Sequence, residues 1–228
     1  MAKKNQKKQE KTIYGIIGLG RFGYALATAL AASGAELMVL DNDEEKVREA
    51  REYTENAFVV HSLDKKSLAE TGIASCDVAV VCIGEQMDVS ILTTLNLVSL
   101  GVKKVIAKAR SAEHGEILEK LGAEVVYPEH DMALRLATRL ETSKILDYMQ
   151  LNEQLNISKL AIPAALVGKT VIEANLRGRF GMNIVAIENG GEVIDFIKPD
   201  YVFRADDVLI VSGRKEGIRR LSELSEPN

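Results

Sequence analysis

Residues 13–41 read IYGIIGLGRFGYALATALAASGAELMVLD, and this stretch decides the fold. An apolar strand is predicted over Ile13–Ile17, followed by the glycine turn 18–23 (GLGRFG) and an alanine-rich helix. A second apolar strand, Leu37–Leu40, ends at Asp41. A GxGxxG motif alone is weak evidence for a nucleotide site, but here it lies between a strand and a helix, with an acidic residue about 20 positions further on. This context predicts a dinucleotide or adenine-nucleotide site.

The chemistry of such a site explains the spacing of these residues. Gly18 suits the tight turn out of the strand, Gly20 lets a diphosphate approach the backbone, and Gly23 lets the helix pack close to the sheet. The helix then offers unpaired N–H groups and a positive dipole end to the phosphates. Asp41 suits hydrogen bonds from ribose hydroxyls. Its charge would repel a 2′-phosphate, which favours NAD, ADP or ATP over NADP.

Composition sets bounds on the class of protein. With 228 residues, the chain has room for one or two domains, and 46% hydrophobic residues allow a substantial core. A net charge of −4 gives no reason to expect nucleic acid. Cys76 and Cys82 lie in or beside an apolar strand, which indicates core cysteines in a reducing compartment. No apolar run is long enough to span a membrane, so a cytoplasmic protein is predicted.

Strands and helices alternate after the glycine turn. Further strands are predicted at Ala57–Val60, Asp77–Gly84, Lys104–Lys108 and Glu124–Tyr127. Helices are predicted at Asp43–Glu52, Lys65–Glu70, Met87–Leu100 and Ala112–Leu121. Regular alternation of this kind predicts an α/β fold with a doubly wound parallel sheet. Its ligand should lie at the carboxyl ends of the strands.

Those strand ends supply the candidate nucleotide-binding residues. Ser62 and Leu63 would border the adenine or ribose. Gly84 either lets the backbone approach the ligand closely or serves only as a turn. Arg21 and Lys108 are the candidate positive charges for phosphates. For Arg21, a solvated surface side chain without a ligand fits the sequence equally well. The remaining candidates at these ends are Phe22, Asn42 and Ile83.

The rest of the chain divides by composition. Residues 1–11 carry five lysines and are predicted to be a disordered solvated tail, with a docking arm as the alternative. Residues 12–130 form the predicted nucleotide-binding domain. One long helix is predicted over residues 131–149, and its apolar residues on more than one face indicate either a crossover into a partner subunit or an ordinary linker helix.

Residues 150–228 have the pattern of a small α+β module. Strands are predicted at Leu155–Ile162, Met182–Glu188, Glu192–Phe196 and Asp207–Ser212, and helices at Lys169–Asn175 and Lys215–Leu224. About 80 residues is a small size for an independent domain, so dimerisation through this module is predicted. Its sequence contains no histidine and no cysteine, which argues against a metal-ligand cluster or a nucleophile–base pair.

Several segments together resemble a known family. They are IIGLGRFG (16–23), VVCIG (80–84), LTTLNLVSLGVKKVIAKA (92–109) and LEKLGAEVVYPEHDMALRLA (118–137). From residue 12 onward the chain resembles Ktr/Trk-type potassium-uptake regulatory subunits of the RCK family, the regulators of potassium conductance. The resemblance implies a Rossmann-like RCK_N domain, a crossover helix and an RCK_C module. It also implies homodimers that assemble into an octameric ring on the cytoplasmic face of a membrane potassium-translocating subunit.

The resemblance implies ligands and roles as well. ATP and ADP compete for the Rossmann site in this family, and NAD or NADH binds in some members. Arg21 matches the arginine that reaches nucleotide phosphates, Asp41 the ribose acid, and Lys108 the basic residue of the fifth strand. His114 matches a histidine of the next helix, and Glu129 a glutamate that helps to hold magnesium or a monovalent cation beside the nucleotide.

The C-terminal module resembles the type that binds cyclic di-AMP between two subunits in Gram-positive relatives. Arg177, Ile184 and Pro199 match the positions that line that groove, and the alternative is a plain dimerisation surface. One departure is residues 61–64, HSLD, where relatives have a GDAT-like segment. Because of this difference, the resemblance does not define the adenine contacts of residues 61–64.

Two other functions fit the glycine motif, an NAD-dependent oxidoreductase and a free-standing nucleotide or redox sensor. A dehydrogenase needs an acid–base residue over the nicotinamide and a substrate pocket. The three histidines, His61, His114 and His130, all lie in the first domain, and none has an evident orienting partner. The sequence therefore favours a regulatory protein without catalysis of its own.

Overall fold

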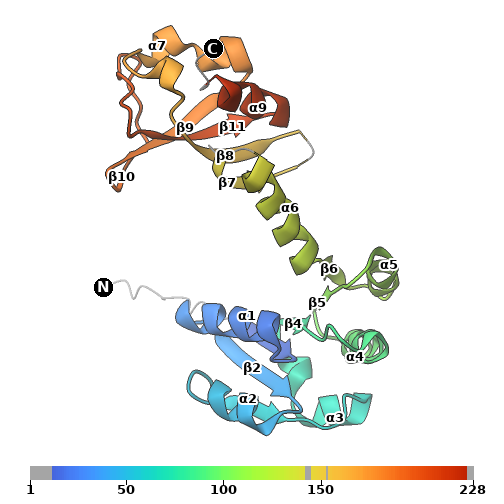
Figure 1. Ribbon diagram of the computed structural model, residues 1–228. Coiled ribbons are helices and arrows are strands. Elements are labelled where there is room, and N and C mark those ends of the chain that lie inside the picture. Colours follow the sequence, from blue (N-terminus) through green and yellow to red (C-terminus); the bar gives the residue numbers. More distant parts are fainter. Residues whose placement is uncertain (1–11, 142–144, 153, 225–228) are drawn as a thin grey trace, which may run out of the picture. The chain divides into compact units, whose positions relative to one another are not determined.

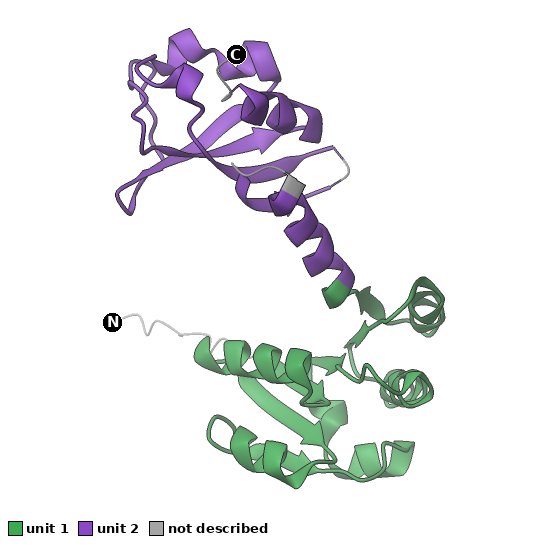
Figure 2. Cartoon of the chain, in the orientation of Figure 1, with its two compact units in different colours: residues 1–129 green, residues 130–228 purple. Residues whose placement is uncertain are grey.

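The computed structural model describes residues 12–141, 145–152 and 154–224. The predicted tail, residues 1–11, lies outside them. The chain divides into two compact units, residues 1–129 and 130–228 (Figure 1, Figure 2). Within the described ranges, no helix combines the length and the apolar character that crossing a membrane requires.

The first unit is a six-stranded parallel sheet in the order β3-β2-β1-β4-β5-β6. Its strands are β1 (Ile13–Ile17), β2 (Glu36–Asp41), β3 (Asn56–Val59), β4 (Val78–Val81), β5 (Lys104–Lys108) and β6 (Glu124–Val126). Its helices are α1 (Arg21–Ala32), α2 (Glu44–Ala50), α3 (Lys65–Glu70), α4 (Met87–Ser99) and α5 (Ala112–Lys120), with a 3₁₀ turn at Ile73–Ser75. The doubly wound prediction is confirmed. Strand order reverses between β1 and β4, where such sheets bind ligands.

Helices pack on both faces of this sheet, because successive strand residues point to opposite sides. Ile16 belongs to one core cluster with Ala27 of α1. Ile17 belongs to another with Leu97 of α4 and Leu118 of α5. Both isoleucines are at most 1% exposed, and burying each contributes about 1.5–3 kcal/mol. The glycine turn therefore leaves a strand whose position is fixed from both faces.

The second unit is a five-stranded antiparallel sheet in the order β10-β9-β11-β8-β7. Its strands are β7 (Ile145–Gln150), β8 (Asn156–Ala161), β9 (Asn183–Asn189), β10 (Glu192–Ile194) and β11 (Val208–Gly213). Its helices are α7 (Val171–Ala174), α8 (Leu176–Phe180) and α9 (Lys215–Glu223), with a 3₁₀ turn at Ala164–Leu166. Leu160 of β8 and Leu209 of β11 are buried in one core with Leu221 of α9. This confirms the predicted α+β module.

The prediction of one helix over residues 131–149 is wrong in its second half. Helix α6 spans Pro128–Glu141, and Ile145–Gln150 is the edge strand β7. Pairing with β8 places the buried Ile145 opposite Leu160 of the core. Long-range hydrogen bonds and burial therefore override the local helical pattern, as is common for short segments. As a result, the sheet of the C-terminal module begins before residue 150.

The predicted helix at Lys169–Asn175 is shorter than expected and is followed by another. Asn175 has φ +41°, a left-handed conformation that ends α7, and its side chain accepts a hydrogen bond from the N–H of Gly178 at the start of α8. Asparagine tolerates this conformation better than most residues. The break orients α8, which carries Arg177, Arg179 and Phe180.

Candidate functional site

The glycine turn follows β1 and has the geometry that its spacing predicts. Gly18 has φ +94°, and its N–H donates to the carbonyl of Leu40 (2.8 Å). A Cβ at position 23 would collide with the carbonyl oxygen of Gly18, so α1 packs here only because Gly23 has no side chain. A Cβ at Gly20 would meet nothing within 4 Å. Gly20 therefore has open space beside its backbone.

Asp41, at the end of β2, holds this turn in place. Its Oδ2 accepts a hydrogen bond from the N–H of Leu19, and its Oδ1 accepts one from the N–H of Asp43 (2.9 Å). A carboxylate accepts about four hydrogen bonds, so lone pairs remain for a ribose hydroxyl. The carboxylate of Asp41 therefore orders the turn before any ligand arrives.

A cavity of about 920 Å³ lies at the carboxyl ends of the parallel strands. All the predicted nucleotide-binding residues except Gly23 and His114 line it: Gly18, Gly20, Arg21, Phe22, Asp41, Asn42, Ser62, Leu63, Ile83, Gly84, Lys108 and Glu129. The size is that of a site for a small organic ligand. The fold thus brings together residues that are far apart in the sequence.

Sequence reasoning missed part of the lining. Lys46, Gln86 and Val89 also border the cavity, and they come from the beginnings of α2 and α4 rather than from strand ends. The available signal was the doubly wound pattern itself, since a helix that follows a parallel strand starts at the same edge of the sheet. Lys46 adds a positive charge near Asp41, with its Nζ 3.6 Å from a carboxylate oxygen of Asp43.

Positive charge is concentrated on the side of the cavity near β5. Arg21, Lys108 and Arg110 all line it, and Arg110 donates to the carbonyl of Glu85 (3.1 Å). The Lys108 side chain is only 12% exposed, and its ammonium lies 5.8 Å from the centre of the Phe22 ring. Such partly desolvated cations attract anions more strongly than surface lysines do.

One carboxylate faces these cations. Glu129, in the first turn of α6, lies 2.5 Å from the Nζ of Lys108. The hydrogen bond from Lys108 lowers the pKa of Glu129 below its usual value, and the charges of Lys108 and Arg21 lower it further. Glu129 is therefore ionised at neutral pH. Its side chain is 68% exposed, which leaves oxygen lone pairs open to a cation.

The structure places His114 outside the cavity, contrary to expectation. The side chain is fully buried in α5, and its Nδ1 accepts from the N–H of Arg110 (3.4 Å). Burial lowers the pKa of His114, and the charge of Arg110 adds to the effect. His114 therefore supports the segment that carries Arg110, which does line the cavity.

The chemistry of the cavity is that of anion binding. Cys82 lines it, but burial raises the pKa of this thiol to about 12, so it is not a thiolate nucleophile at neutral pH. Among the described residues, no cluster of three or more histidine, cysteine or carboxylate side chains has the arrangement of a metal site. Converging cations and a glycine turn suit a ligand that carries phosphates.

In the second unit, the three residues predicted for a ligand groove come from three elements. Arg177 is exposed on α8, Ile184 is partly buried on β9, and Pro199 is exposed in the segment after β10. The carbonyl of Pro199 accepts a hydrogen bond from the N–H of Ile172 (3.2 Å), which joins this segment to α7.

Comparison with known proteins gives a consistent result. Residues 14–128 match the TrkA-N domain, and residues 157–225 match the TrkA-C domain. The chain is 38% identical over 214 residues to Ktr system potassium uptake protein C of Bacillus subtilis, covering 93% of this chain and 97% of that protein. It is 32% identical over 208 residues to Ktr system potassium uptake protein A of the same organism, covering 91% and 94%.

Solved structures with the same fold include RCK domains. The chain aligns with the GsuK RCK domain at a TM-score of 0.64 and 20% identity, covering 96% of this chain and 49% of that one. It aligns with the GsuK channel bound to NAD at a TM-score of 0.65 and 19% identity, covering 96% and 40%. The chain thus spans about half or less of those two chains, and the likeness to them is one of fold.

Proposed function

This chain belongs to the family of Ktr and Trk potassium-uptake proteins with a TrkA-N and a TrkA-C domain, and from this premise we propose that it is a nucleotide-gated regulatory subunit. The observation that carries the proposal is the cavity beside the glycine turn, which Arg21, Lys108 and Arg110 line. Its role is binding without catalysis. A change of bound nucleotide would be passed to a membrane potassium-translocating partner.

ATP and ADP are the proposed ligands of the cavity, with NAD or NADH as further candidates. The carboxylate of Asp41 supports an unmodified ribose, because it would repel a 2′-phosphate. ATP and ADP differ only by the terminal phosphate. Contacts that distinguish them must therefore be made by groups that reach that phosphate, and Arg21 and Lys108 are the cations proposed for this task.

Gating follows from a difference in affinity. A ligand shifts a conformational equilibrium only by as much as its affinities for the two states differ. Allosteric couplings are typically about 1–3 kcal/mol. One phosphate in contact with one or two arginine or lysine side chains supplies energy of this size, since a hydrogen bond to a charged group contributes about 1.5–3 kcal/mol.

Glu129 is the proposed ligand for a cation beside the nucleotide, either magnesium or a monovalent ion. Its ionised and exposed carboxylate lies next to the phosphate-binding cations. A cation there would join the nucleotide phosphates to the first turn of α6. Since α6 leads along the chain to the C-terminal unit, this is a physical connection between ligand and second domain.

The C-terminal unit is the proposed site for cyclic di-AMP, with Arg177 for a phosphate and with Ile184 and Pro199 for apolar contacts. Arginine suits phosphate because its fork of N–H donors matches two oxygens. The test is calorimetric titration of the full chain with cyclic di-AMP. Arg177→Gln should abolish binding, and Arg214→Gln, an exposed arginine after β11, should not.

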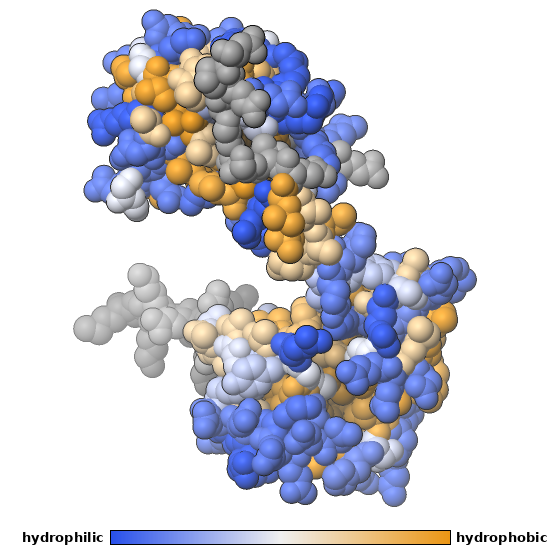
Figure 3. Space-filling model, viewed as in Figure 1, coloured by the Kyte–Doolittle hydropathy of each residue, from blue (hydrophilic) through white to orange (hydrophobic). Residues whose placement is uncertain are grey.

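Assembly is proposed to proceed through homodimers to an octameric ring on the inner face of the cell membrane, held there by the partner. Apolar side chains gather along α6 (Figure 3). Met132 is 58% exposed, Leu136 46% and Leu140 76%. Exposed apolar residues at helical spacing are typical of a surface that packs against another chain.

The experiment that tests the function uses Arg21→Ala in the full chain. The variant should still bind ADP but lose the ATP-specific stimulation of potassium flux in vesicles that contain the membrane partner. Arg48→Ala is the matched control, because Arg48 lies on the exposed face of α2 and pairs only with Glu45 among the described residues. Equal ATP stimulation of wild type and Arg21→Ala would refute the proposal, as would steady oxidation of NADH by the purified chain.

A further inference from the structure

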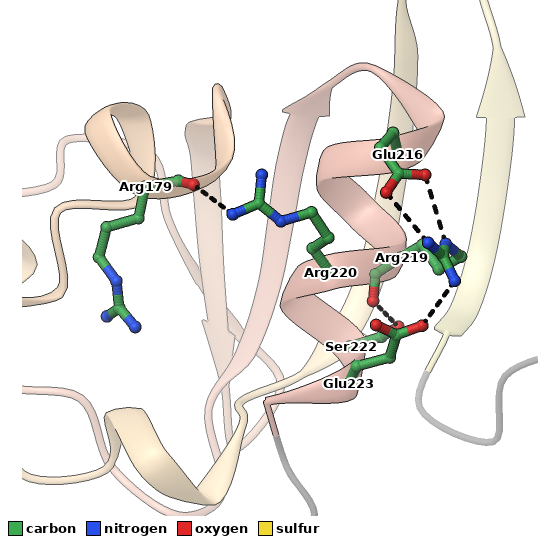
Figure 4. Close-up of polar contacts among 6 residues, drawn as sticks. All are labelled: Arg179, Glu216, Arg219, Arg220, Ser222 and Glu223. Carbon is green, nitrogen blue, oxygen red and sulfur yellow. Dashed lines mark hydrogen bonds and ion pairs between the residues drawn. The ribbon is translucent and has the colours of Figure 1, made fainter.

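The C-terminal unit contains a second cavity, of about 490 Å³. It is lined by Arg179, Phe180, Arg220, Glu223 and Leu224. These residues come from the last turns of α8 and α9 and from the residue after α9 (Figure 4). The groove residues proposed above for cyclic di-AMP are not among them, so this cavity is a separate feature of the unit.

Two arginines place their charges beside one aromatic ring here. The Cζ of Arg179 lies 5.0 Å from the centre of the Phe180 ring, and the Cζ of Arg220 lies 5.6 Å from it. Arg220 donates one hydrogen bond to the carbonyl of Arg179 (3.2 Å), and Arg179 donates one to the carbonyl of Ala174 (3.4 Å). A guanidinium has five N–H donors. Most donors of both side chains therefore have no partner within the described residues.

The adjacent arginine is different. Arg219 donates to both carboxylate oxygens of Glu216 (3.0 and 3.3 Å) and to Glu223 (3.0 Å) (Figure 4). The hydrogen bond with Glu216 raises the pKa of Arg219. Glu223, the acid in the cavity lining, thus already pairs with Arg219. Arg179 and Arg220 form no ion pair with a carboxylate of the described chain, so the cavity keeps an excess of positive charge.

We propose that this cavity binds a phosphate group between Arg179 and Arg220. Guanidinium forks match the oxygens of a phosphate, and an anion between two like charges relieves their repulsion. The dipoles of α8 and α9 favour a cation in each last turn. The dipole effect explains a cation at each helix end, but it does not explain why both arginines lie beside one ring and line one cavity.

The phosphate has two sources with the same chemistry, a free phosphate ion and the headgroup of an anionic lipid. The test therefore has two arms, both with the full chain. In one, inorganic phosphate is titrated calorimetrically. In the other, co-sedimentation is measured with vesicles of phosphatidylglycerol and, for comparison, of phosphatidylcholine. Arg179→Gln and Arg220→Gln are the test variants, and Arg214→Gln is the control, because Arg214 is exposed and lies outside the cavity lining.

Each test variant should weaken binding in at least one arm by about tenfold, the effect of losing a hydrogen-bonded charge, while Arg214→Gln should change it less than about twofold. Other phosphate sites of the chain are the same in all four proteins, so the difference belongs to this cavity. Circular dichroism melting curves identify any variant that has lost its fold, and for such a variant Arg→Met, which keeps a long apolar stem but carries no charge, replaces Arg→Gln. Loss in the phosphate arm identifies a free phosphate, and loss only with phosphatidylglycerol identifies a lipid headgroup.

Three results would overturn the proposal. The first is equal binding by all four proteins in both arms, including no binding by any of them. The second is a loss in Arg214→Gln as large as in the test variants, because it would show a general charge effect. The third is a change in self-association by sedimentation velocity with no change in either arm, which would assign the arginines to an acidic segment of a second copy.

Discussion

The Nζ of Lys108 lies 2.5 Å from a carboxylate oxygen of Glu129, which pairs the end of β5 with the first turn of α6 at the edge of the cavity. Lys108 is nearly buried and Glu129 is mostly exposed. A phosphate that binds Lys108 must therefore compete with a carboxylate or be joined to it by a cation. This contact links the charge of the ligand to the helix that leaves the domain.

Glu129→Gln should raise the affinity for ADP measured in the presence of a metal chelator, by about two- to fivefold. The amide still accepts a hydrogen bond from Lys108 but no longer repels the phosphate. The same change should remove any gain in affinity on adding magnesium. Calorimetric titration with and without the chelator measures both effects. Glu124→Gln is the control, since Glu124 pairs with Lys104 away from the cavity lining. Unchanged ADP affinity in Glu129→Gln would contradict the competition.

Gly20→Ala and Gly23→Ala should separate binding from folding. At Gly20 a methyl group has free space, so the fold should persist while ADP affinity falls by about tenfold or more, or about 1.4 kcal/mol. At Gly23 the methyl group meets the carbonyl of Gly18, and such overpacking costs about 1–3 kcal/mol of stability. Two measurements distinguish the variants. The fluorescence of a bound nucleotide analogue reports affinity, and urea denaturation monitored by circular dichroism reports stability. A Gly23→Ala protein as stable as wild type would show that α1 shifts freely.

Asp41→Asn should loosen the glycine turn even without a ligand. Its carboxylate accepts from the N–H groups of Leu19 and Asp43, and an amide NH₂ cannot accept the second bond. Losing a bond to a charged group costs about 1.5–3 kcal/mol locally. Amide hydrogen exchange at Leu19 should accelerate accordingly. Asp43→Asn is the control, because asparagine caps a helix as well as aspartate does. Equal exchange rates at Leu19 in the two variants would contradict the role of Asp41.

His114 should make the first unit less stable in mild acid. Burial lowers the folded-state pKa, so the unfolded chain binds the proton first as pH falls. Its neutral form contributes fully above the unfolded pKa of about 6.5, and that stability is lost as pH falls from there toward the lower folded value. Denaturation midpoints between pH 5 and 7.5 measure this slope.

His114→Gln should flatten the slope, whereas His130→Gln should preserve it, because His130 is exposed and contacts only Asp131 among the described residues. An identical pH dependence in wild type and His114→Gln would show that another group titrates in this range.

Much of the first unit could be predicted from local patterns. Apolar strands with helices between them admit few arrangements once both faces of the sheet must be covered. The spacing of the glycines predicted the tight turn at Gly18 and the close helix packing at Gly23 that the structure shows. By contrast, residues 145–150 could not be assigned locally, because their strand exists only through pairing with β8.

The residues of the candidate site likewise include some that the sequence predicts and some that only the packing decides. Residues at strand ends follow from the topology, since carboxyl ends of parallel strands share one edge. Lys46 and Val89 reach the cavity from helices, and how far a helix residue points toward a cleft depends on the packing of the whole unit. The burial of His114 is likewise a property of the packed core, because α5 alone does not show which face is covered.

The sequence by itself determined the glycine turn, the acid at the end of the second strand and the alternation that produces the parallel sheet, because these depend on backbone geometry and on short-range spacing. Only the tertiary structure decided that Lys108 pairs with Glu129, that residues 145–150 form a strand, and that Arg179 and Arg220 share one ring while Arg219 is neutralised. Each of those facts is a contact between side chains or strands distant in sequence or set by packing, and such contacts are fixed by the free energy of the whole fold rather than by any local pattern.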